Sequence, residues 1–207
     1  MNSEHESGLS LSRLEALTDG IYAIAMTLLV LNLIIPTVPE SEAAQKIPII
    51  LTQDWQKFVN YVVSFILLSV YWMIHHMQSR QFTRTDTNHV WINIYTLMFV
   101  VLIPFSFSLV SDYPSLQITN LVFQCNLCVV GLLTYANWAY ATHDHRLVDA
   151  SMSPEYIAVG KRRSLMIPVL SVLAALATYV SPDHSNMVYL LSIFAKPALS
   201  KTKQGAA

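Results

Sequence analysis

Long apolar stretches recur at intervals along this chain, and they constrain its fold more than any other feature. A helix that crosses the hydrocarbon core of a bilayer needs about 20 mainly apolar residues. Five stretches meet or approach this length, at residues 14–35, 58–77, 90–110, 118–141 and 165–180, and a shorter sixth lies at residues 187–199. Only 12% of the residues are charged, whereas a typical soluble domain has roughly 25%. We therefore predict an all-α integral membrane protein with six transmembrane helices in a single domain, residues 1–207.

The basic residues alternate between the two sides of these predicted spans. Ten of the 12 lysines and arginines lie in the N-terminal segment, the second loop, the fourth loop and the C-terminal segment. The other three loops hold only Lys46 and Lys57. Because cytoplasmic loops are the ones enriched in Lys and Arg, this alternation predicts a multi-pass protein with both termini in the cytoplasm. It also requires an even number of spans, which supports counting the short sixth stretch.

One stripe of the first predicted span is apolar with a single exception. At about 100° per residue, seven residues share this face of a helix: Leu17, Gly20, Ile24, Thr27, Leu28, Leu31 and Ile35. On these residues alone, such a stripe is more often a packing surface or a lipid-facing surface than the wall of a pore. The chain also has no Thr-Val-Gly-Tyr-Gly sequence, so a filter of backbone carbonyls of that type is absent.

Three short motifs occur in order along the first three spans. Arg13 precedes Leu17-Thr18-Asp19-Gly20, the second span ends with Trp72-Met73-Ile74-His75-His76, and the third contains Leu102-Ile103-Pro104-Phe105. Over about residues 13–197 the chain resembles the transmembrane protein 175 family of lysosomal and prokaryotic potassium channels. That family has an arginine, three variable residues and Phe-Ser-Asp-Gly, then Trp-x-x-His-His, then Leu-Pro-Phe. Leu17-Thr18 replaces the family's Phe-Ser.

The resemblance implies a potassium-selective channel that conducts K+ passively. Prokaryotic members of the family are tetramers of six-helix subunits, so this chain would form a homotetramer in the lipid of the cell (inner or plasma) membrane. In the family the first helix lines the central pore. Carried over, Ile24, Leu28 and Leu31 would form apolar constriction rings, with Ile24 the narrowest. Thr27 would help to select K+ and Asn32 would lie at the outer mouth. Narrow apolar rings of this kind can gate by dewetting.

The arginine and the aspartate of the opening motif lie at the predicted cytoplasmic end of the first span. Arg13 and Asp19 are six positions apart, or about 240° on a helix, so we do not expect them to pair with each other. The resemblance implies a polar network that ties the pore helix to its neighbours, with His75, His76 and Asn93 as the other members. The alternative is that Arg13 reaches the lipid headgroups and Asp19 caps a turn in water.

The sequence is also compatible with other kinds of transport. A coupled secondary transporter usually needs a charged residue at mid-depth and broken helices in paired halves. No span here has an acidic or basic residue in its middle, and no half-repeat is visible. A proton-permeable channel stays open because a chain of water molecules conducts protons without any carboxylate. A structural membrane subunit without transport is a further alternative.

The chain gives only weak signals of a metal site. Histidines close the second span, at His75 and His76, and the fourth, at His143 and His145, and imidazole clusters can bind iron or zinc. However, no His-x-x-His-His run occurs, and the pair Cys125 and Cys128 supplies only two ligands. We therefore expect no metal, no cofactor and no enzymatic activity. The net charge of -1 gives no basic field for nucleic acid.

Overall fold

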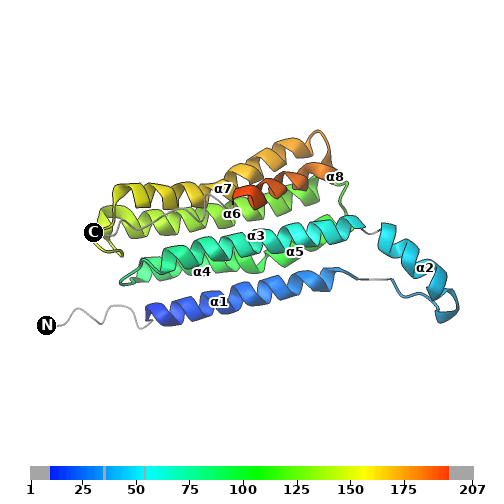
Figure 1. Cartoon of the computed structure of the whole chain (residues 1–207), viewed down its shortest axis with the longest axis horizontal. Coiled ribbons are helices and arrows are strands. Elements are labelled where there is room, and N and C mark those ends of the chain that lie inside the picture. Colours follow the sequence, from blue (N-terminus) through cyan, green and yellow to red (C-terminus); the bar gives the residue numbers. More distant parts are fainter. Residues whose placement is uncertain (1–9, 35, 54, 196–207) are drawn as a thin grey trace.

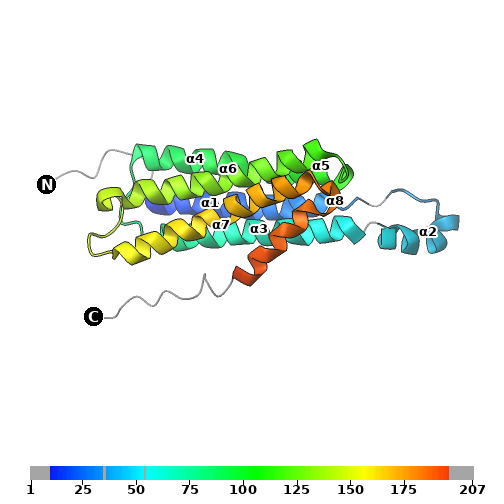
Figure 2. The same cartoon turned by 90° about the horizontal axis from the view of Figure 1, so that it is seen from above.

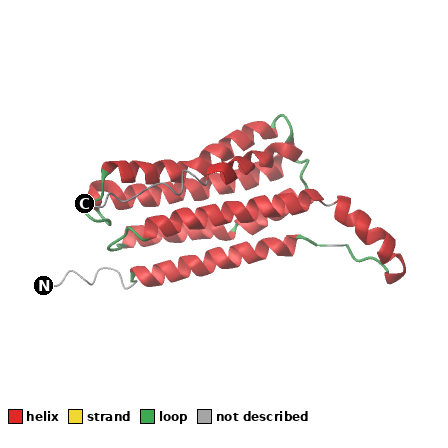
Figure 3. Ribbon diagram, viewed as in Figure 1, coloured by secondary structure: helices red, strands yellow, loops and turns green. Residues whose placement is uncertain are grey.

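The computed structural model describes residues 10–34, 36–53 and 55–195. Its regular elements, in chain order, are α1 (Leu11–Leu28), η1 (Leu29–Asn32), α2 (Glu40–Gln53), α3 (Trp55–Ser79), α4 (Thr87–Val101), α5 (Ile103–Asp112), α6 (Gln117–Thr142), η2 (His143–His145), α7 (Pro154–Thr178), α8 (Pro182–Ser185) and η3 (Asn186–Ala195). The η elements are 3-10 helices, so every regular element in the described ranges is helical, as Figure 3 shows. The all-α class predicted from the sequence is confirmed.

Four helical segments are long and apolar enough to cross a membrane. They are Leu11–Asn32, Trp55–Ser79, Thr87–Asp112 and Gln117–His145, and they coincide with the first four predicted spans. The apolar part of α7 is shorter, because Lys161, Arg162 and Arg163 lie in the N-terminal half of that helix. The predicted sixth span, residues 187–199, overlaps the 10-residue helix η3, and residues 196–199 lie outside the described part of the chain.

The long helices run side by side, and α1 lies at one edge of the bundle (Figure 1). One core cluster joins buried side chains from the first, third and later helices, including Leu29, Tyr71, Ile103, Leu127 and Ile167. The buried residues of α1 are Leu14, Thr18, Tyr22 and Ala25. They recur at intervals of three or four, which places them on one face of the helix. The opposite face of α1 is therefore left without cover inside the subunit.

The third predicted span is interrupted near its middle. α4 ends at Val101 and α5 begins at Ile103, with Pro104 in the first turn of α5. Proline lacks an N–H and its ring clashes with the carbonyl four residues before it, so it breaks or kinks a helix. The two parts still follow one another closely enough to count as one span.

A helix that the sequence analysis did not predict lies between the first two spans. α2 extends past the ends of α1 and α3 (Figure 1, Figure 2). Its first turn carries Glu40 and Glu42. Their negative charges stabilise the helix, because its N-terminus carries a partial positive charge. Glu42 forms an ion pair with Lys46 one turn later. Its apolar residues, Ile47–Leu51, are too few for a span.

α6 approaches α7 and α3 closely at Gly131. A Cβ atom added at Gly131 would lie 2.4 Å from Cγ of Pro168 and 3.0 Å from the hydroxyl of Tyr71. That hydroxyl donates a hydrogen bond to the carbonyl of Leu127. Three helices therefore approach one another at a position where only glycine fits.

Replacing Gly131 by alanine is expected to destabilise the subunit by about 1–3 kcal/mol, because overpacking forces the proline ring away. The measurement is thermal unfolding of the purified protein in detergent. Gly20→Ala is the matched control, since a Cβ at Gly20 would have nothing within 4 Å. Equal melting temperatures for the two variants would contradict the packing described here.

Candidate pore face and polar network

The predicted pore stripe is the face of α1 that the subunit leaves uncovered. The exposed fraction is 60% for Ile24, 38% for Leu28 and 65% for Leu31. On the other side of the same helix, Tyr22 is 1% exposed and Leu29 is fully buried. An exposed apolar stripe on a membrane-spanning helix faces either lipid or another protein surface.

Thr27 is exposed on the same stripe, and its hydroxyl group already donates a hydrogen bond within the helix. Its Oγ1 donates to the carbonyl oxygen of Ile24 at 2.8 Å. A hydroxyl has one donor and two acceptor lone pairs, so the oxygen of Thr27 keeps its capacity to accept. Such an oxygen can replace a water molecule around a cation. Asn32 is half-buried at the end of η1, where its Nδ2 lies 3.4 Å from the carbonyl of Leu29.

Three buried polar side chains join α1, α3 and α4. His75 Nε2 lies 3.1 Å from Asn93 Oδ1, and Asn93 Nδ2 donates to Thr18 Oγ1 at 2.9 Å. Thr18 in turn donates to the carbonyl of Leu14 at 2.9 Å. The structure thus brings together two of the predicted network residues, His75 and Asn93. It adds Thr18, which the sequence analysis noted only as part of the opening motif.

Asp19 makes a separate contact with α3. Trp72 Nε1 donates to Asp19 Oδ1 at 2.8 Å, and the Trp72 ring stacks on His76 with 5.4 Å between ring centroids. The sequence analysis did not identify Trp72 as a partner of Asp19. Arg13 is exposed, and no side-chain partner for it is found among the described residues. The two halves of the network therefore attach the N-terminal half of α1 without Arg13.

A cleft lies beside this second contact, between α1 and α3. Its walls are formed by Glu15, Asp19, His75, His76, Ser79 and Arg80. Charged side chains of both signs thus lie near the N-terminal half of the helix that carries the stripe. Within the described ranges, no group of three His, Cys, Asp or Glu side chains is placed to hold a metal ion.

Replacing Asp19 by alanine is expected to weaken folding or assembly more than permeation. It removes the acceptor of the Trp72 N–H, which is worth about 1 kcal/mol per subunit at this exposed position. The measurements are the melting temperature and the fraction of assembled protein, compared with the ion flux per assembled molecule. Glu15→Ala removes a neighbouring carboxylate but leaves the Trp72 bond intact, so it serves as the control. A fully stable assembly in the Asp19 variant would contradict this role.

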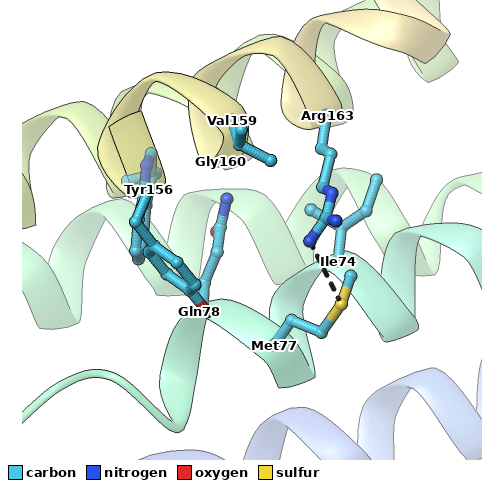
Figure 4. A pocket seen from close by; sticks show the side chains of 8 residues that line it. Ile74, Met77, Gln78, Tyr156, Val159, Gly160 and Arg163 are labelled. Carbon is cyan, nitrogen blue, oxygen red and sulfur yellow. Dashed lines mark hydrogen bonds between the residues drawn. The ribbon is translucent and has the colours of Figure 1, made fainter. Parts of the chain in front are cut away.

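A second cavity lies inside the subunit rather than on the stripe. Figure 4 shows it between α3 and α7, and its lining residues are Ile74, Met77, Gln78, Trp138, Tyr156, Val159, Gly160 and Arg163. Arg163 Nη1 lies 3.8 Å from Met77 Sδ, and Gln78 Nε2 donates to Ser164 Oγ at 2.8 Å. The stripe on α1 contributes nothing to this cavity, so the cavity is not part of the predicted pore.

Comparison with known proteins extends the resemblance seen in the motifs. The sequence model of the family described as endosomal/lysosomal potassium channel TMEM175 matches residues 13–104. This range contains the predicted pore stripe, both polar contacts and the break between α4 and α5. The expected relationship to this family is confirmed.

Individual relatives cover more of the chain. A potassium channel of Streptomyces collinus is 28% identical over 70% of this chain and 69% of its own. A crystal structure of a lysosomal potassium-selective channel TMEM175 homolog from Chamaesiphon minutus superposes with a TM-score of 0.78 at 25% identity, covering 92% of this chain and 98% of that one. The endosomal/lysosomal proton channel TMEM175 of Danio rerio is 25% identical over 92% of this chain, which spans 37% of the fish protein.

Proposed function

The chain belongs to the TMEM175 family, and we propose that it forms a potassium-selective channel in the cell membrane. Four copies surround a central pore, each with six spans and with both termini in the cytoplasm. Conduction is passive, and it needs neither a chemical reaction nor a cofactor. The names of the bacterial relatives, which are called potassium channels, support this proposal.

The observation that carries the proposal is the uncovered stripe of α1. One helix per subunit cannot enclose a pore, so several copies must contribute, and soluble and membrane homo-oligomers are usually symmetric. A helix at the edge of the bundle, with one face buried and the opposite face open, is suited to that role. Ile24, Leu28 and Leu31 would then meet their counterparts across the axis.

The chemistry of such a pore follows from its rings. Apolar rings offer no ligands to a hydrated ion, and a narrow apolar passage empties of water when it closes slightly. The ring of Thr27 oxygens, one turn from Ile24, can replace part of a hydration shell. Since K+ gives up its shell more readily than Na+, this ring would favour K+. Asn32 would contribute amide groups near the outer mouth.

Proton conduction is the second candidate function. The vertebrate relatives at 24–25% identity are named proton channels. A water chain through the same pore would conduct protons, and the exposed oxygen of Thr27 is a hydrogen-bonding group that such a chain can use. K+ and proton conduction would share the same rings.

Ion flux from purified protein in liposomes separates these functions. With a K+ gradient we expect dissipation that needs no coupling ion, and with a Na+ gradient a much slower flux. A pH-sensitive dye inside the liposomes reports proton entry when K+ is absent. Dissipation that requires a second ion would identify a coupled transporter, and no flux of any ion would contradict the proposal.

A further inference from the structure

The break between α4 and α5 is bridged by a side chain from another helix. In an unbroken helix the N–H of Ile103 would bond the carbonyl of Phe99 four residues earlier. Here the amide of Asn126, on α6, lies between these two groups. With the amide assigned in the orientation that satisfies both backbone groups, its nitrogen donates to Phe99 O at 3.3 Å and its oxygen accepts from Ile103 N at 3.2 Å. The same oxygen lies 3.2 Å from Ser106 Oγ.

The position of this amide follows from the nearby proline. Pro104 has no N–H, and its ring pushes away the carbonyl of the preceding turn, which opens the adjacent backbone bonds as well. Inside a membrane no water replaces the lost bonds, so neighbouring helices must supply partners. Ile103 is fully buried and Asn126 is 8% exposed. A single buried amide therefore satisfies one donor and one acceptor that the bend has separated.

The helix that follows the bend packs against the proposed pore helix in the core of the subunit. α5 packs against η1 and against α1. Leu29, the first residue of η1, is fully buried in the same core cluster as Ile103 and Phe107. Leu28 and Leu31 lie on the opposite, exposed face of this segment. A change in the angle between α4 and α5 would therefore disturb the packing of η1, and with it the part of the stripe that contains Leu28 and Leu31.

We propose that Asn126 is a positioning residue for ion permeation, which holds the α4–α5 bend and thereby sets the placement of Leu28 and Leu31. The role in permeation rests on the proposed channel function. The role in holding the bend does not, so the two parts can be tested separately.

Stability tests the first part. Asn126→Leu is expected to lower the melting temperature by about 5 °C, because two buried backbone groups lose their partner. The matched control is Asn137→Leu on the same helix. Asn137 is 2% exposed, and its Oδ1 has no hydrogen-bond partner among the described residues, so we expect a much smaller shift.

Restoring the backbone bond should remove the need for Asn126. Pro104→Ala supplies an N–H and removes the ring, so Ile103 can bond Phe99 directly. In this background, Asn126→Leu is expected to have roughly half its effect on the melting temperature or less, since neighbouring changes that share a partner are coupled. Equal shifts with and without Pro104, or equal shifts for the Asn126 and Asn137 variants, would overturn the bridging role.

Ion flux tests the second part with a readout that a purely structural role would not move. The double variant, Pro104→Ala with Asn126→Leu, is expected to be more stable than the Asn126→Leu single variant and to have a straighter third span than the wild type. Its K+ flux in liposomes, or its K+/Na+ ratio, should differ by roughly threefold or more, a modest change in barrier height. Wild-type flux and selectivity in this variant would show that the bend does not position the pore. A wild type without any K+ flux would instead refute the channel function, while the stability comparison would still stand.

Discussion

Replacing Ile24 by asparagine is expected to raise the resting K+ flux by roughly tenfold, which corresponds to about 1.4 kcal/mol removed from the barrier. In the proposed tetramer four apolar side chains meet at this level, and an ion must shed water to pass them. Four amides would keep the passage wet and give the ion polar partners. A hydrated ring cannot close by dewetting. Flux from liposomes with a K+ gradient, normalised to the amount of assembled protein, is the measurement.

A matched substitution separates a pore effect from a general disturbance of the membrane surface. Val172 belongs to α7 and is 54% exposed, similar to Ile24. Figure 1 shows α7 in the part of the bundle far from α1. Val172→Asn places the same amide at a position that the proposal assigns to lipid. We expect it to leave the K+ flux unchanged. Similar increases for both variants would mean that Ile24 does not line the pathway.

Replacing Thr27 by valine is expected to reduce the K+/Na+ permeability ratio by roughly tenfold, or about 1.4 kcal/mol of discrimination. Valine has nearly the same shape but no oxygen, so the ring would lose its only ligands while the width of the pore stays the same. The total flux should change less than the ratio. Reversal potentials measured with K+ on one side of the bilayer and Na+ on the other give the ratio directly.

The control for this experiment keeps the hydroxyl. Thr27→Ser retains a hydroxyl group that can donate a hydrogen bond to the carbonyl of Ile24 and an oxygen that can coordinate a cation. Its permeability ratio should therefore stay close to that of the wild type. Thr27→Ala should behave like the valine variant. An unchanged ratio in the valine and alanine variants would remove Thr27 from the selectivity mechanism.

The positions of the first four spans could be predicted from the sequence because lipid imposes a length and a composition on any helix that crosses it. α2 was missed for the same reason: Ile47–Leu51 is too short to be a span, and Pro48 argues against a helix in isolation. The helix that contains the fifth stretch begins earlier than its apolar residues. Pro154 starts it and Ser153 accepts a hydrogen bond from the N–H of Tyr156. This start signal lies outside the apolar pattern.

The candidate site could be predicted only in part. Helical periodicity groups Ile24 with Leu28 and Leu31, but it does not tell which face the other helices will cover. The partner of Asp19 lies 53 positions away at Trp72, and no local pattern links two such residues. The proline at 104 was visible in the sequence as part of a motif. The side chain that bonds the separated backbone groups is Asn126 on α6, and this contact depends on how the helices pack.

Distances between copies of the chain test the central arrangement most directly. Spin labels would be attached at Ile24→Cys, in a background where Cys125 and Cys128 are replaced by alanine, and pulsed electron resonance would measure the separations in liposomes. Labels at Val172→Cys provide the comparison. We expect the separations at position 24 to be far shorter than those at position 172 and to fit a square around one axis. Separations at position 24 that equal or exceed those at position 172 would place the stripe in lipid and contradict the pore.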